Sequence, residues 1–173
     1  MQMIENVQRY PGRWVIHKQD VAQHSHSVSY NALKIMQMLN LLEDNELVAK
    51  VLTFCVLHDM PEAWTSDIPY DVKHQSGSDV EKALEVIEQK AIDKYLNSWT
   101  YTFKELNECK KERTLAYLIL KYADTLDVLD YCKVERTLGN MSKDIENIYT
   151  HAEEKLEDLF DELQHKLNES GTY

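Results

Sequence analysis

A few polar residues at the ends of apolar runs carry the side chains that could do chemistry in this chain. His58 and Asp59 are adjacent and directly follow the apolar run that ends at Leu57, His24 lies well upstream, and Asp124 interrupts a later apolar run. A buried carboxylate is costly unless a cation or several donors meet it. Two imidazoles and two carboxylates suit a divalent transition metal such as Mn, Co, Ni or Zn. We therefore expect a metal site formed by these four residues.

Two positions of this predicted site have competitors nearby. His26 competes with His24, because a helix points residues two apart in different directions. Asp127 competes with Asp124. On a helix these two lie near one face, so Asp127 can instead orient a ligand or the substrate. Spacing alone leaves both choices open.

Helices must position these residues, and the composition predicts helices throughout. The 173-residue chain has only 4 Gly and 3 Pro, and its apolar residues recur every three to four positions. We expect helices over about 20–40, 45–58, 80–96, 112–138 and 142–168, a short helix and loop over 62–71, and an irregular segment over 98–110. Length and pattern together predict an all-α, single-domain helical bundle over residues 1–173.

The last predicted helix has one apolar face between acidic residues. Its apolar positions are Leu156, Leu159, Phe160, Leu163 and Leu167. Such a stripe cannot stand alone in water, so it either closes the bundle or docks a second subunit. We expect the protein to form a homo-oligomer.

Charge and cysteine content limit the partners and the compartment. A net charge of −11 argues against binding polymeric nucleic acid, whose phosphates need a basic face. A small anion remains possible, because a metal ion can reverse the potential locally. Cys55, Cys109 and Cys132 show no CxxC spacing and are odd in number, which favours free thiols in a reducing cytoplasm. The chain has no apolar run long enough to span a bilayer, so we expect no membrane partner and a cytoplasmic location.

The order His…His-Asp…Asp resembles the HD phosphohydrolase superfamily. Within it the chain is most similar to the bacterial and phage 5′-deoxynucleotidases, followed by the small phage deoxynucleoside triphosphate triphosphohydrolases. The resemblance covers about residues 5–135. It rests on Arg9-Tyr10-Pro11, Gln23-His24-Ser25, His58-Asp59-Met60-Pro61-Glu62, Asp67-Ile68-Pro69, Lys73 and Ala123-Asp124. It implies an HD-type bundle with a metal site between helices and a small-molecule deoxynucleotide as substrate.

The resemblance also implies residues that bind the substrate. Arg9 stands fifteen residues before the first metal histidine, the spacing of the family's phosphate-binding arginine. Arg13 is the fallback, at a shorter spacing. Tyr10 replaces a tryptophan that packs on the sugar in the family, and Lys73 adds charge near a more distant phosphate. Asp127 is expected beside the metal or the substrate.

Glu62 and Asp67 are the catalytic residues that the resemblance implies. They would orient or deprotonate the attacking water and protonate the leaving oxygen. The implied reaction converts a deoxynucleoside 5′-monophosphate to deoxynucleoside and phosphate. The alternative is release of triphosphate from a dNTP, helped by a second ion such as Mg at Glu62 and Asp67. The modest number of basic residues near the motifs favours the monophosphate. Another HD phosphohydrolase activity, on alarmones or cyclic nucleotides, and a non-catalytic HD scaffold are further alternatives.

Overall fold

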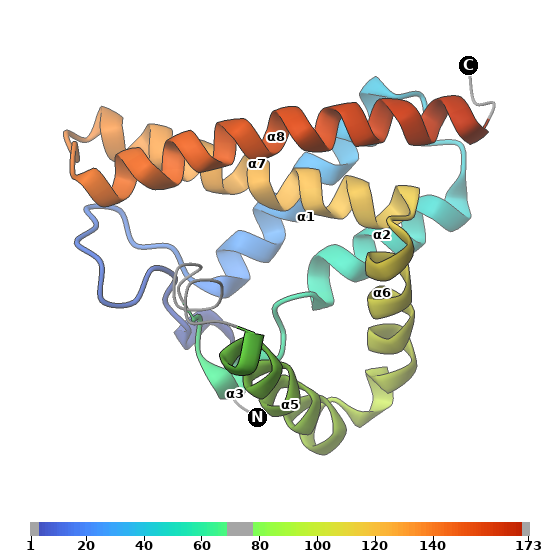
Figure 1. Cartoon of the computed structure of the whole chain (residues 1–173), viewed down its shortest axis with the longest axis horizontal. Coiled ribbons are helices and arrows are strands. Elements are labelled where there is room, and N and C mark those ends of the chain that lie inside the picture. Colours follow the sequence, from blue (N-terminus) through green and yellow to red (C-terminus); the bar gives the residue numbers. More distant parts are fainter. Residues whose placement is uncertain (1–3, 69–77, 171–173) are drawn as a thin grey trace.

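The computed structural model describes residues 4–68 and 78–170, and these residues are mostly helical (Figure 1). The elements are η1 (Ile4–Asn6), α1 (Val21–Met38), α2 (Asn45–Leu57), α3 (Glu62–Thr65), α5 (Ser78–Tyr95), η2 (Asn97–Trp99), α6 (Thr100–Glu112), α7 (Leu115–Thr137) and α8 (Lys143–Ser170). Within the described ranges no strand forms, and an isolated antiparallel bridge joins Gln8 to Asp20. The predicted all-α class is confirmed.

Capping side chains fix where α1 and α2 begin. The Asp20 carboxylate accepts a hydrogen bond from the Gln23 N–H (2.8 Å), and the Gln23 side chain accepts one from the Asp20 N–H (3.0 Å). This reciprocal pair is a capping box. The Asp44 carboxylate accepts from the Leu47 N–H at 3.0 Å and caps α2. Both starts agree with the helices predicted from about residues 20 and 45.

One prediction about the elements was wrong: residues 98–110 are helical, not irregular. They form η2 and most of α6, whose buried residues are Phe103 and Cys109. The many charged residues in this segment hide its narrow apolar face. Arg113 then ends α6 in the left-handed conformation (φ 52°, ψ 47°), and Thr114 caps α7. The helix predicted over 112–138 therefore begins three residues later, because its first residue belongs to α6.

Helix α7 lies at the centre of the bundle, with α8 running along it and α1 and α2 packing against it (Figure 1). The largest cluster of buried side chains joins all four helices. Its fully buried members include Val28, Met36, Phe54, Leu118, Ile119 and Leu159. This packing matters for function because α1, α2 and α7 carry the predicted metal ligands.

The apolar face of α8 closes the bundle from above α7. Leu156, Leu159, Leu163 and Leu167 are buried there. Phe160 follows Leu159 by one residue, a turn of about 100°, and its side chain is 49% exposed at the edge of the face. The turn from α7 to α8 passes through Gly139 at φ 96°, a left-handed conformation that favours glycine after a helix.

Over the described residues, no helix combines the length and apolar character that crossing a membrane requires.

Candidate metal centre

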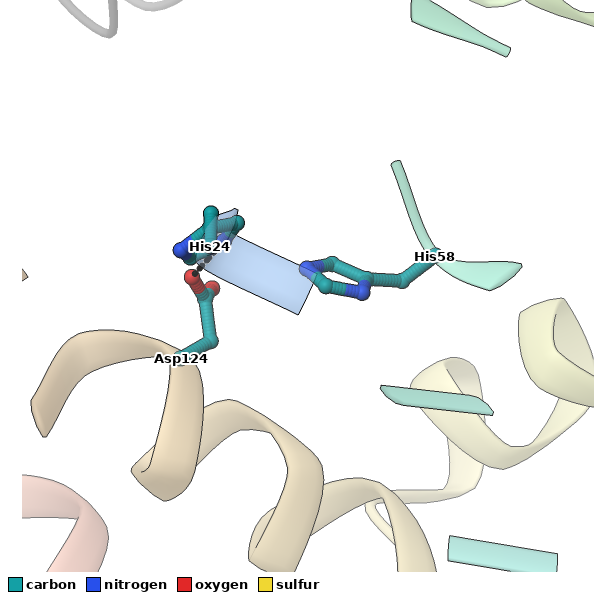
Figure 2. Close-up of side chains that lie close together, drawn as sticks. All are labelled: His24, His58 and Asp124. Atoms are coloured by element: carbon teal, nitrogen blue, oxygen red, sulfur yellow. Dashed lines mark ion pairs between the residues drawn. The ribbon is translucent and has the colours of Figure 1, made fainter. Parts of the chain in front are cut away.

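Three helices bring the predicted metal ligands together. His24 lies in the first turn of α1, on the same buried face as Val21 and Val28. His58 follows the last residue of α2 and continues its helical backbone, with its N–H donating to the Phe54 carbonyl (2.9 Å). Asp124 lies in the middle of α7. Figure 2 shows the two imidazoles and the Asp124 carboxylate converging on one point.

The distances between these side chains match those expected of metal ligands. His24 Nε2 lies 3.3 Å from Asp124 Oδ1 and 3.4 Å from Asp59 Oδ2, and His58 Nε2 lies 3.3 Å from the same Asp59 oxygen. Ligand atoms of His24, His58 and Asp124 all lie within 4.8 Å of one another. Two ligands each about 2.1 Å from one ion lie roughly 3.0–3.4 Å apart. The spacing therefore suits a first-row divalent ion.

The hydrogen bonds of the two imidazoles leave the correct nitrogens free for a metal. His24 Nδ1 lies 2.7 Å from Asp127 Oδ2, and His58 Nδ1 lies 2.9 Å from the Cys55 carbonyl oxygen. When each Nδ1 carries the proton and donates it to these acceptors, each Nε2 keeps a lone pair. Both Nε2 atoms are buried, and neither has a hydrogen-bond partner among the residues that the structure describes. A buried polar atom is normally paired, so the donor set fits a divalent cation at this position.

The surrounding charges favour a positive charge at the centre. Burial and Arg9 lower the pKa of His24, but the nearby carboxylates of Asp124, Asp127 and Asp59 outweigh them and raise that pKa to about 10. Burial raises the pKa of the Asp59 carboxyl, and the two histidines together bring it below its ordinary value. A metal needs neutral imidazole, so binding displaces the proton from His24.

Lys121 holds the outer oxygen of Asp124. Its Nζ lies 2.6 Å from Asp124 Oδ2, while Oδ1 faces His24. Burial raises the pKa of the Asp124 carboxyl, but Lys121 and His24 outweigh burial and keep that pKa well below its usual range. Asp124 in turn raises the pKa of Lys121 to about 12. Sequence analysis missed this lysine, although its position three residues before Asp124 on one helix was a signal.

Arg9 lies behind the imidazole of His24. Its Nη1 lies 3.4 Å from Asp127 Oδ2 and contacts His24 Nδ1. Arg13, the fallback for the phosphate-binding role, instead pairs with Asp144 on α8 at 3.3 Å. The structure thus brings Arg9, rather than Arg13, to the centre.

The two competitors at the metal ligands also separate in space. His26 is exposed on α1, whereas His24 is fully buried. Asp127 is buried and hydrogen-bonds to His24 Nδ1, on the opposite side of the ring from Asp124. This places Asp127 where it orients a ligand.

Tyr10 and Asp67 are joined by a backbone contact. Asp67 Oδ2 accepts a hydrogen bond from the Tyr10 N–H at 2.9 Å, and Tyr10 adopts a left-handed backbone with φ 58°. The Tyr10 ring stacks on Tyr131 with centroids 4.5 Å apart and packs beside Cys132 and Ile145. Burial raises the pKa of Tyr10 well above its ordinary value. Tyr10 is therefore packed between the loop and α7.

Glu62 is buried at the start of α3, and its N–H donates to the Asp59 carbonyl at 3.0 Å. The turn after α2 thus places Glu62 three residues after Asp59, with its backbone tied to that residue. Lys73, expected near the substrate, lies outside the described residues.

Comparison with known families identifies the chain. The model of the 5′-deoxynucleotidase YfbR-like family matches residues 1–167. The chain belongs to this family. A search of curated proteins finds no match.

Solved structures with the same fold include three from different sources. An HD-domain phosphohydrolase from Listeria innocua aligns with a TM-score of 0.72 and 21% identity, covering 96% of this chain and 82% of that one. A protein from Pyrococcus horikoshii OT3 gives 0.68 and 24%, covering 91% and 85%. The HD phosphohydrolase DatZ of cyanophage S-2L, bound to dA and one catalytic Zn²⁺ ion, gives 0.66 and 16%, covering 96% and 91%. The predicted HD-type bundle is confirmed.

Proposed function

We propose that this protein is a metal-dependent phosphohydrolase that converts deoxynucleoside 5′-monophosphates to deoxynucleoside and phosphate. One observation carries the proposal. The Nε2 atoms of His24 and His58 are buried, have no hydrogen-bond partner among the described residues and face the carboxylates of Asp59 and Asp124. Membership in the 5′-deoxynucleotidase YfbR-like family supports the reaction class.

His24, His58, Asp59 and Asp124 would hold the ion, with Mn, Co, Ni and Zn as the candidates for this mixed donor set. When bound, such an ion polarises a phosphoryl oxygen and lowers the pKa of a bound water. The chain's own residues supply the rest. Glu62, buried at the start of α3 and three residues after Asp59, would accept the proton of the attacking water. Arg9, whose Nη1 contacts Asp127, would clamp the phosphate with two parallel N–H donors.

Asp67 has two tasks in this proposal. One oxygen holds the Tyr10 N–H and so keeps the adjacent Arg9 in place. The other, once it carries a proton, would donate that proton to the leaving oxygen of the sugar while Glu62 takes the proton of the attacking water. The separate tasks explain why a carboxylate suits this position better than an amide.

Countercharge favours the monophosphate over the triphosphate. Among the described residues, Arg9 and Lys121 are the cations that contact site carboxylates, and each is already paired with one of them. A triphosphate brings more negative charge and needs more cations or a second ion. Glu62 and Asp67 are the carboxylates that a second ion such as Mg would use, so release of triphosphate from a dNTP is the second candidate.

The leaving group separates the two candidates directly. We would load the protein with Mn, Co, Ni or Zn in turn and incubate it with deoxynucleoside mono- and triphosphates and matching ribonucleotides. Release of orthophosphate from deoxynucleoside monophosphates is the expected result. Release of tripolyphosphate from a triphosphate would show that the second candidate is correct, and no hydrolysis of either class with any metal would refute the proposal.

We also infer a cytoplasmic location, because Cys55, Cys109 and Cys132 are all buried and unpaired. Homo-oligomer formation stays a prediction for sedimentation analysis.

A further inference from the structure

One oxygen of Asp127 accepts from three different donors. Its Oδ2 lies 2.7 Å from His24 Nδ1, 3.0 Å from Gln19 Nε2 and 3.4 Å from Arg9 Nη1. Asp127 thus touches both a proposed metal ligand and the proposed phosphate clamp. Gln19 is the neutral member of this group, and it is 8% exposed.

Gln19 also binds Arg9 through both its side chain and its backbone. Arg9 Nη1 lies 3.4 Å from Gln19 Oε1, and the Arg9 N–H donates to the Gln19 carbonyl at 2.9 Å. The next residue pair outward, Gln8 and Asp20, forms the antiparallel bridge. The Gln19 side chain is therefore held in place from two sides.

The chemistry of its neighbours fixes the orientation of the Gln19 amide. An ionised carboxylate only accepts hydrogen bonds and a guanidinium only donates them. The NH₂ group must therefore face Asp127, and the carbonyl oxygen must face Arg9. A glutamate here could not donate to Asp127, and a lysine could not accept from Arg9. Only an amide of this length can serve both neighbours at once.

We propose that Gln19 is a positioning residue that acts through Asp127 on the metal ligand His24. The amide fixes the Asp127 carboxylate. That carboxylate keeps the proton of His24 on Nδ1 and turns Nε2 toward the ion. Outer carboxylates of this kind are typically worth 10–100-fold in metal affinity or activity. The inference rests on the metal-dependent function proposed above.

The test measures metal binding, separately from turnover. Metal-free wild type, Gln19→Met, Asp127→Ala and the double variant would be titrated with Zn²⁺ against a chromophoric chelator at constant pH. Visible spectra of the Co²⁺-loaded proteins would report the ligand geometry. Gln8→Met is the matched control, because Gln8 is exposed on the same bridge. Thermal melting of each metal-free protein checks folding, and Gln19→Asn, one methylene too short, replaces a variant that does not fold.

Gln19→Met should weaken Zn²⁺ binding about tenfold and change the Co²⁺ spectrum, with Gln8→Met unchanged. In the Asp127→Ala background, Gln19→Met should cause no further loss of Zn²⁺ affinity, because the carboxylate through which Gln19 acts is already removed. The inference would be overturned if Gln19→Met bound Zn²⁺ as tightly as the wild type. It would also be overturned if the losses of Zn²⁺ affinity from the two substitutions multiplied in the double variant. Absence of metal binding or hydrolysis by the wild type refutes the proposed function instead, so the two failures are distinguishable.

Discussion

The phosphate-binding arginine gives the sharpest test of the proposed site. Arg9 and Arg13 lie four residues apart in one loop, and each forms an ion pair, so substitution of either removes one charge from the same segment. Their partners differ. Arg9 pairs with buried Asp127 beside His24, whereas Arg13 pairs with Asp144, whose side chain is 57% exposed.

The structure predicts very different effects for the two substitutions. Arg9→Ala removes a charge-assisted clamp on the phosphate, and the loss of about 3 kcal/mol of transition-state stabilisation lowers kcat/KM roughly a hundredfold. Arg13→Ala breaks an ion pair that is exposed on its Asp144 side, and it should change kcat/KM less than about threefold.

Steady-state hydrolysis of a deoxynucleoside monophosphate by the metal-loaded variants measures this difference. Arg9→Lys keeps the charge without the planar fork of donors, so it should recover only part of the loss. Metal affinity of each variant should be recorded at the same time, because Arg9 also contacts Asp127 and His24. The reverse ranking, with Arg13→Ala the more damaging change, would refute the assignment of Arg9.

Three further outcomes are expected. Asp59→Ala should lose bound metal by elemental analysis and lose activity with it, and full metal content with full activity would remove Asp59 from the ligand set. Glu135→Gln should lower the free energy of unfolding by about 2–4 kcal/mol at pH 7, because the Glu135 carboxylate accepts from the Ile16 and His17 N–H groups and from Asn140. Burial raises the pKa of Glu135, but these bonds outweigh it and bring the pKa below its ordinary value. The stability that the Glu135 carboxylate contributes is therefore present above the unfolded pKa of about 4.3 and is lost as pH falls through the lower folded pKa. The difference in free energy of unfolding between wild type and Glu135→Gln, measured by urea melts, should disappear in that acid range. A difference that is independent of pH would contradict this reasoning. Deleting residues 151–173 removes four buried leucines worth about 1.5–3 kcal/mol each. Their combined contribution is comparable to the total stability of a small protein. Circular dichroism should therefore show an unfolded or aggregated chain, and a folded, active chain would show that this part of α8 is dispensable.

The sequence by itself was enough for the all-α class, for the approximate helix limits and for the set of candidate ligands. Helix periodicity is a local property, so helices were expected from about residues 20 and 45, where the structure has Asp20 and Asp44 as the caps of α1 and α2. Local pattern failed at α6, because its charged residues outnumber its buried ones and only packing of Phe103 and Cys109 shows which face is inside.

Tertiary structure decided which polar residues meet and which atoms face the centre. His24 and His26 are equally polar in sequence, but burial of the α1 face selects His24. Asp124 and Asp127 share a helix face, yet they approach opposite nitrogens of the same imidazole. Gln19 carried no signal in the sequence. Its place in the site comes from a loop returning beside Arg9, across from a helix more than a hundred residues later in the chain. Local patterns cannot encode such contacts, because the geometry that creates them exists only after the helices pack.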